Sequence, residues 1–198
     1  MMSVEPCTLT GKLVRLEPLE SRHAEDLFLT GQEDEMWLYM FANPCASREA
    51  MAQWIADTLR LQQIGDSLAF AIIDLATGRA IGSTRYLAIS AKDYGLEIGW
   101  TWLDPSVRRT GVNTECKYLL LTQAFEVWKA IRVQLKTDSR NIRSQNAIVR
   151  IGGIKEGVLR NHIIMPDGYR RHTVYFSILD SEWPGVKAGL EAKMLRAL

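Results

Sequence analysis

The sequence has few cysteines and histidines and no excess of either charge. None of its three cysteines forms a C-x-x-C pair, and the three histidines follow no ligand spacing. We therefore expect neither a disulfide framework nor a metal site. With 24 basic and 23 acidic residues, the chain also lacks the basic surface of a nucleic-acid-binding protein. The three cysteines are Cys7, Cys45 and Cys116, and the three histidines are His23, His162 and His172.

The sequence also lacks long hydrophobic runs. It contains no stretch of about 18 apolar residues, the length that a membrane span requires. The first ten residues lack the basic start and apolar core of a signal peptide. We therefore expect a cytoplasmic protein without a membrane partner.

What is present is the composition of a globular protein, with 47% hydrophobic and 24% charged residues. The length predicts one domain over residues 1–198, with a core at about 9–179 and a C-terminal helical tail at 180–198.

Hydrophobic periodicity predicts alternating strands and helices. Three expected strands follow one another directly, which excludes a doubly wound parallel sheet. The order fits an α/β (α+β) domain with a mixed, mostly antiparallel sheet flanked by helices. The expected strands are 9–19, 68–75, 80–88, 94–103, 132–137, 157–165 and 169–179. The expected helices are 21–31, one starting at Ser47, 114–130, 144–151 and one starting near 181.

The segment 102–115 is the most informative part of the chain. A strand runs into a basic loop that opens a long helix, and the first N–H groups of a helix attract anions. Gly111 would let backbone approach a phosphate, and Arg108 and Arg109 add charged donors. No P-loop or G-x-G-x-x-G motif is present. From these residues alone, a pyrophosphate site and a surface loop capped at Asn113 both stay open.

The residues 108–113 resemble the acetyl-CoA pyrophosphate loop of GNAT N-acetyltransferases, whose pattern is Q/R-x-x-G-x-G/A. The segments 97–100 and 102–105 resemble the strand leading into that loop in the RimJ/RimL-like branch. Asn141-x-x-Ser144, followed by Gly152, resembles the second helix signature of that branch. The resemblance covers about residues 9–179. One departure is Asn113, which stands where the family has Gly or Ala and adds a side chain beside the phosphates.

The resemblance implies acetyl-CoA as co-substrate, with CoA as product and no metal. It also implies direct transfer to a primary amine, for example a protein N-terminus. The pyrophosphate would lie on the backbone of 109–114 and the pantetheine arm along 96–103. A homodimer stays open, because dimers are common among relatives. The implied cofactor contacts are Trp102, Leu103, Arg108, Arg109, Thr110, Gly111, Val112, Asn113, Thr114 and Asn141.

Two residues are candidates for the chemistry. Glu97 is an ionisable residue in an apolar strand, where burial would raise its pKa, and a general base must deprotonate the amine. Its alternative is a salt bridge or a solvated face. The resemblance makes Ser144 the proton donor to the leaving thiolate, and helix capping is the alternative for both Ser144 and Asn141.

The acceptor groove of the resembled family is lined by the connection between the first two helices and by the last hairpin. Trp37 and Tyr39 lie in the first and are candidate acceptor contacts, with core packing as the alternative. Arg170 and Arg171 lie in the second, where a guanidinium suits a carboxylate. Cys116 falls in the first turn of the long helix, where a thiol pKa is lowered, although a buried hydrophobe is its simpler role.

A CoA-binding sensor or interaction module without catalysis is the alternative function. A nucleic-acid-binding domain using Arg108, Arg109, Arg140 and Arg143 is disfavoured by the balanced charge.

Overall fold

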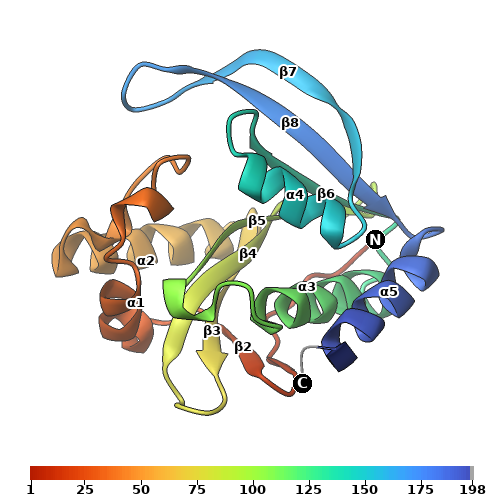
Figure 1. Cartoon of the computed structure of the whole chain (residues 1–198), viewed down its shortest axis with the longest axis horizontal. Helices are drawn as coiled ribbons and strands as arrows, with labels where there is room; N and C mark the ends of the chain where they lie inside the picture. The colour runs from red at the N-terminus through yellow and green to blue at the C-terminus, as the bar shows by residue number, and fades with distance from the viewer. Residues whose placement is uncertain (197–198) are drawn as a thin grey trace.

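The eight strands form one sheet in the order β1-β2-β3-β4-β5-β6-β8-β7 (Figure 1). The structure, a computed structural model, describes residues 1–196, so the last two residues of the expected tail lie outside it. Within this range only β5 and β6 are parallel neighbours, which confirms the mixed, mostly antiparallel sheet. The strands are Leu9–Thr10, Val14–Pro18, Ser67–Asp74, Ala80–Ser90, Gly95–Leu103, Arg132–Asp138, Ile154–Ile164 and Arg170–Leu179 for β1 to β8.

Within residues 1–196, five α-helices cover the two faces of this sheet. Alternate residues of β3 enter different cores: Phe70 joins the cluster packed on α3 and α5, whereas Ala71 joins the cluster packed on α1 and α2. Successive strand side chains point to opposite faces, so the two helix groups lie on opposite sides of the sheet. The helices are Ala24–Thr30, Arg48–Gln63, Val112–Thr122, Ile142–Arg150 and Trp183–Arg196 for α1 to α5.

Local signals set several element boundaries. The Ser47 hydroxyl accepts the Ala50 N–H and starts α2. Gly78 has a φ of +72° in the turn between β3 and β4. Pro184 lies in the first turn of α5, where its missing N–H removes no helical bond.

The expected single strand at 9–19 is wrong, because the chain turns at Gly11 and forms β1 and β2. The cause is Glu115 of α3, whose carboxylate accepts the backbone N–H groups of Lys12, Leu13 and Val14 at 2.7–2.9 Å. A Cβ at position 11 would lie 2.4 Å from the Glu115 side chain. Glu115 therefore fixes the turn from about a hundred residues away along the chain.

The expected ends of two helices also need correction. The long helix begins at Val112 with Gly111 as its N-cap, so Asn113 is inside the first turn and not the cap. After Thr122 it continues as a π-helix over Gln123–Val127. The first helix is preceded by a 3₁₀ turn at Ser21–His23, capped by Glu20 rather than by Ser21.

The sheet opens into a fork between β5 and β6, and this fork positions the site. The two strands pair only through Gly95–Arg132, Leu96–Val133 and Glu97–Gln134. Beyond Glu97, β5 continues along β4 while β6 continues along β8 as far as Asp138. Their C-terminal halves therefore separate and leave unpaired strand edges facing each other.

Candidate active site

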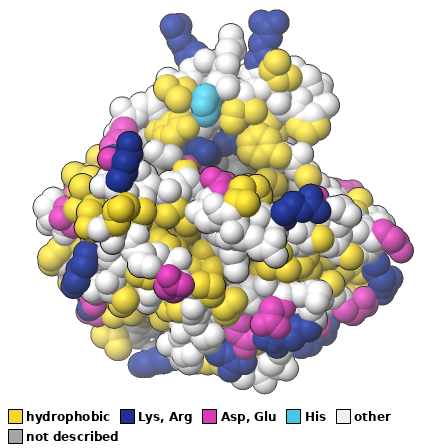
Figure 2. Space-filling model, turned by 180° about the vertical axis from the view of Figure 1, so that it is seen from behind, with side chains coloured by type: hydrophobic (Ala, Val, Ile, Leu, Met, Phe, Trp, Pro, Cys, Tyr) yellow, Lys and Arg dark blue, Asp and Glu magenta, His cyan; other side chains and the backbone are white. Residues whose placement is uncertain are grey.

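A cleft of about 920 Å³ lies at this fork. It is lined by β5 and the loop after it, the start of α3, the end of β6, α4 and the segment 36–41. Seen from behind, the molecule is hollowed below its upper projection, with basic and acidic side chains near the hollow (Figure 2). The cleft therefore joins the predicted phosphate loop to the predicted general base.

At the loop end, backbone N–H groups are the available donors. Within residues 1–196, the N–H groups of Arg109, Gly111, Asn113 and Thr114 have no hydrogen-bond acceptor. They cluster where the N-terminus of α3 carries partial positive charge. Since free donors at a helix start bind phosphate oxygens well, the observed loop fits the pyrophosphate that the sequence predicts there.

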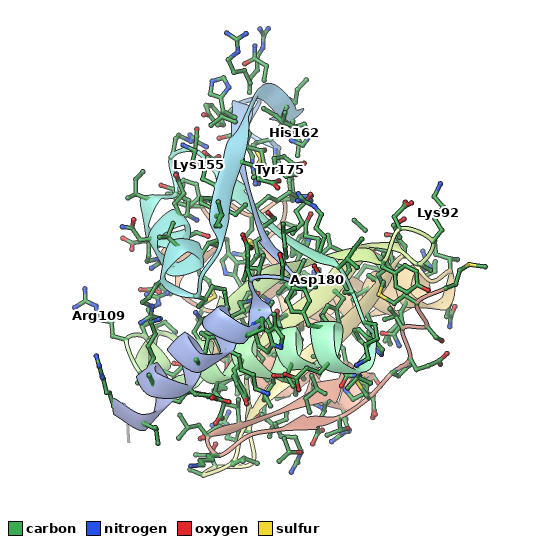
Figure 3. All side chains as sticks on the ribbon, turned by 90° about the vertical axis from the view of Figure 1, so that its right-hand side faces the viewer. Lys92, Arg109, Lys155, His162, Tyr175 and Asp180 are labelled. Atoms are coloured by element: carbon green, nitrogen blue, oxygen red, sulfur yellow. The ribbon has the colours of Figure 1, made fainter. Side chains whose placement is uncertain are left out.

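The side chains of this loop contribute less than expected. Arg108 lines the cleft but is ion-paired with Glu33. Arg109 has a φ of +63° and is exposed, and its side chain projects outward from the loop (Figure 3). Thr110 turns its hydroxyl to the Val107 carbonyl at 2.7 Å. The loop therefore offers backbone rather than side-chain donors.

The remaining predicted cofactor contacts divide between core and cleft. The Val112 and Thr114 side chains are buried, so a ligand would meet only their backbone. Trp102 is 4% exposed and packs edge-on against Trp37 at 5.1 Å between ring centroids. Leu103 is half-buried and lines the cleft.

Glu97 lies at the fork and is only 2% exposed. Gln134 donates to its Oε2 at 2.8 Å, and the Lys136 Nζ lies 3.0 Å from the same atom. Its Oε1 has no hydrogen-bond partner among the described residues. A Cβ at position 99 would lie 3.1 Å from that atom, so Gly99 leaves room beside it. A buried carboxylate held through one oxygen and open at the other is suited to accept a proton.

Across the cleft, α4 presents Ser144 and Asn141. The Asn141 side chain caps the helix by accepting the Ser144 N–H at 3.0 Å, so its capping alternative is realised while it still lines the cleft. Ser144 lines the cleft in the first turn of α4. Its hydroxyl makes no hydrogen bond within residues 1–196, so it is free to donate to a ligand.

A β-bulge in β5 faces the middle of the cleft. Ser83 pairs with Trp102 and Arg85 with Gly99, which leaves one extra residue in β5. Trp100 in this segment has a φ of +49°. Such a bulge leaves a residue unpaired in the strand ladder, and Gly99, Trp100 and Thr101 line the cleft at this point.

Lys117 of α3 reaches the same bulge and was not among the sequence candidates. Its Nζ donates to the Thr101 hydroxyl at 2.6 Å, and burial lowers its pKa to about 8. No sequence signal marked it, because a lysine in an amphipathic helix normally faces solvent.

The predicted acceptor contacts are only partly brought together. Tyr39 lines the cleft and extends its hydroxyl toward the Arg140 carbonyl at 3.5 Å. Trp37 requires a correction, because it is buried in the core and donates its indole N–H to the Gly31 carbonyl. Arg170 is exposed at the hairpin and does not line the cleft.

The arginine of the hairpin that lines the cleft is Arg171, which is 4% exposed. Along β8 it has the same parity as Thr173 and Tyr175, which pair with Asp138 and Lys136. Paired residues share a face, so Arg171 lies on the face of Lys136 and Glu97. Lys136 was also missed, although its alternation with Gln134 in the predicted strand at 132–137 was visible.

The expectation for Cys116 is also corrected. Its thiol is fully buried, and burial raises its pKa to about 12. A thiolate nucleophile is therefore disfavoured at this position.

Within residues 1–196, no group of three or more metal-ligating side chains lies together. None of the helices in this range combines the length and apolarity that crossing a bilayer requires.

The fork, the free N–H groups and the buried carboxylate fit a transferase that uses an acyl-CoA. A family model described as "Acetyltransferase (GNAT) domain" matches residues 14–154. The chain therefore belongs to the GNAT acetyltransferase family and is an N-acetyltransferase of that family, as the resemblance implied.

Individual proteins agree with this assignment. The chain is 27% identical over 173 residues to "Putative ribosomal N-acetyltransferase YdaF" of Bacillus subtilis, covering 87% of this chain and 92% of that one. A GCN5-related N-acetyltransferase from Brucella melitensis superposes with a TM-score of 0.90 and 30% identity, over 96% of this chain and 86% of that one. Mycobacterium smegmatis RimJ, solved with CoA-disulfide, shares the fold with a TM-score of 0.81 and 20% identity over 95% of each chain.

Proposed function

We propose that this protein binds acetyl-CoA in the cleft and transfers the acetyl group directly to a primary amine, with a protein N-terminus as the acceptor. The observation that carries the proposal is that Glu97 lines the same cleft as Arg109 and Asn113, which contribute two of the free backbone N–H groups at the start of α3. The YdaF relative, named as a ribosomal N-acetyltransferase, supports the choice of a protein acceptor.

The backbone of 109–114 would hold the pyrophosphate of acetyl-CoA, and the open edge of β5 would hold its pantetheine arm. Acetyl-CoA supplies an acetyl thioester with a good leaving group. Placing this thioester beside an amine in one cleft removes an entropic cost of about 7–11 kcal/mol from the barrier.

Glu97 acts as the general base. An ammonium has no lone pair, so one proton must leave before the nitrogen attacks the thioester carbon. The unpartnered Oε1 of Glu97 accepts this proton, directly or through a water, while Gln134 and Lys136 hold Oε2. The C–N bond forms, the C–S bond breaks, and the nitrogen loses its remaining extra proton.

Ser144 assists the leaving group. Its free hydroxyl donates to the departing thiolate, and the N-terminus of α4 also stabilises negative charge there. The thiolate takes one proton and leaves as CoA. Of the two protons that the ammonium loses, the other passes to solvent.

The experiment is to measure release of the CoA thiol from acetyl-CoA, with a cell lysate filtered into macromolecular and small-molecule pools as acceptors. Boiled protein is the control. We expect thiol release with the macromolecular pool, and acetylated protein N-termini by mass spectrometry.

Two outcomes contradict the proposal. Release with the small-molecule pool alone would make the protein a metabolite acetyltransferase. No thiol release with either pool, combined with measurable acetyl-CoA binding, would favour a CoA-binding sensor that lacks catalysis.

A further inference from the structure

Arg171 is a buried guanidinium that has no anionic partner. It is 4% exposed, its Nε has no hydrogen-bond partner, and no side chain within residues 1–196 forms an ion pair with it. Its Cζ lies 5.3 Å from the centroid of the Phe41 ring, in a cation–π contact. Burial is the main cause that lowers its pKa. A buried charge without a partner is costly, so a functional reason for it must be sought.

The carboxylates near Arg171 are already used by other groups. Glu97 binds Gln134 and Lys136. Asp138 binds the backbone and guanidinium of Arg140 at 2.8–3.3 Å. The two ion pairs, Glu97 with Lys136 and Asp138 with Arg140, are each neutral. Neither of these carboxylates therefore neutralises Arg171, which is a buried guanidinium in the wall of the cleft.

A second buried arginine shows that burial alone does not define such a site. Arg85 is also 4% exposed, but it lies between the rings of Trp54 and Trp100 and donates to the Thr58 hydroxyl at 3.1 Å. It does not line the cleft. Arg171, like Arg85, has an Nε without a hydrogen-bond partner, but it lines the cleft and its guanidinium donates to no group within residues 1–196.

We propose that Arg171 binds a carboxylate of the amine acceptor, so that the substrate class is amines that carry a carboxylate near the reacting nitrogen. The inference rests on the proposed function, because it places the acceptor in this cleft. A guanidinium pairs with a carboxylate through two parallel hydrogen bonds. The single charge of one guanidinium matches a monoanionic carboxylate better than a doubly charged phosphate.

The carboxylate has two chemical sources. It belongs either to an acidic side chain next to the N-terminus of a peptide or to the α-carboxyl group of a free amino acid. Two matched pairs of ligands separate them. One pair is the C-terminally amidated peptides Ala-Asp-Ala-Ala and Ala-Asn-Ala-Ala, and the other is alanine and alaninamide.

Calorimetric titration of each ligand into the full-length protein with CoA present measures binding without turnover. We expect the acid to bind at least about 10-fold more tightly than its amide in one pair, because a charged hydrogen bond is worth about 1.5–3 kcal/mol. Preference in the peptide pair assigns the acidic side chain, and preference in the alanine pair assigns the α-carboxylate. Equal affinities within both pairs would overturn the proposal.

Variants test whether Arg171 is responsible. Arg171→Gln should reduce the ratio to about 2-fold or less, and Arg171→Lys should reduce it several-fold, since lysine lacks the planar fork. Arg160→Gln is the matched control, since Arg160 is exposed on the same hairpin and does not line the cleft. A full ratio in either Arg171 variant would overturn the proposal. Circular dichroism verifies folding, and if Arg171→Gln does not fold, Arg171→Lys decides.

Acetyl transfer to the same ligands separates this inference from the proposed function. Acid preference in binding without acetyl transfer supports the carboxylate site and contradicts catalysis. Acetyl transfer without acid preference in binding supports catalysis and contradicts the carboxylate site.

Discussion

The two ends of the cleft bind by different chemistry. At the loop end, the free donors are backbone N–H groups, while Arg108 is paired with Glu33 and Arg109 projects outward. At the acceptor end, the charges belong to buried side chains, chiefly Glu97 and Arg171. Side-chain substitutions should therefore be tolerated at the loop end and costly at the acceptor end.

The largest effect is expected at Glu97. Glu97→Gln keeps the size of the side chain but removes the proton acceptor, so kcat should fall by about 10²–10⁴-fold. The affinity for acetyl-CoA should stay within about 3-fold, because the proposed contacts to its pyrophosphate come from the backbone of 109–114 and not from Glu97. Steady-state kinetics and calorimetry measure the two quantities.

Glu156→Gln is the control for this substitution. Glu156 pairs with Arg132 and Ser177 on the same sheet but does not line the cleft. Equal activity of Glu97→Gln and Glu156→Gln would remove Glu97 from the mechanism.

Glu115 is a second buried carboxylate, and it can be compared with Glu97. Glu115→Ala leaves the three N–H groups of the β1–β2 turn without their acceptor, which should cost about 3 kcal/mol of unfolding free energy. For a chain of this size, the melting temperature should fall by about 6–12 °C. The folded variant should keep its kcat, because Glu115 does not line the cleft.

Thermal melts and kinetics below the transition test this prediction. The exposed carboxylate of Glu191, substituted by Ala, is the control. A loss of kcat without a loss of stability would mean that Glu115 has the role assigned to Glu97.

Lys117 lies where the two ends of the cleft meet and predicts a pH effect on stability. Its folded pKa of about 8 is below the ordinary value of 10.5. Between these values the unfolded chain holds a proton that the folded chain lacks, so the contribution of Lys117 to stability rises with pH. Below about pH 8 the buried ammonium destabilises the fold.

Lys117→Met should therefore be more stable than the wild type at pH 7. Its advantage should shrink by about 3 kcal/mol as pH rises from 8 to 10.5. Urea unfolding of both proteins at a series of pH values measures the difference. A constant difference would show that Lys117 keeps one protonation state throughout.

The smallest effects are expected from the side chains of the loop. Arg109→Ala should weaken CoA binding by less than about 3-fold in physiological salt, because an exposed charge is screened.

The backbone of the same loop should matter more than its side chains. Asn113→Pro removes one free N–H and is tolerated in the first turn, so it should weaken CoA binding by about 10-fold or more. Asn113→Ala controls for the lost side chain. A larger loss in Arg109→Ala than in Asn113→Pro would reverse the comparison between backbone and side chains.

The difference between the two ends of the cleft also explains which features could be predicted from the sequence. The candidate phosphate loop could be predicted because its free N–H groups lie within the short segment 109–114, and the helix start at Ser47 follows from one cap. The order of strands and the mixed sheet followed from hydrophobic periodicity.

Contacts between residues that are far apart in the chain could not be predicted from the sequence. The division of the first strand depends on Glu115, about a hundred residues away. The partners of Glu97 come from β6, which meets β5 only at the fork. Whether Arg170 or Arg171 enters the cleft depends on which face of β8 is turned to it, and periodicity cannot fix that face without knowledge of the neighbouring strand.

The most direct test is a crystal structure of the protein with CoA. The account predicts that the pyrophosphate accepts hydrogen bonds from backbone N–H groups of 109–114, with the sulfur at the fork between Glu97 and Ser144. A pyrophosphate held mainly by arginine side chains, or a sulfur far from Glu97, would contradict it.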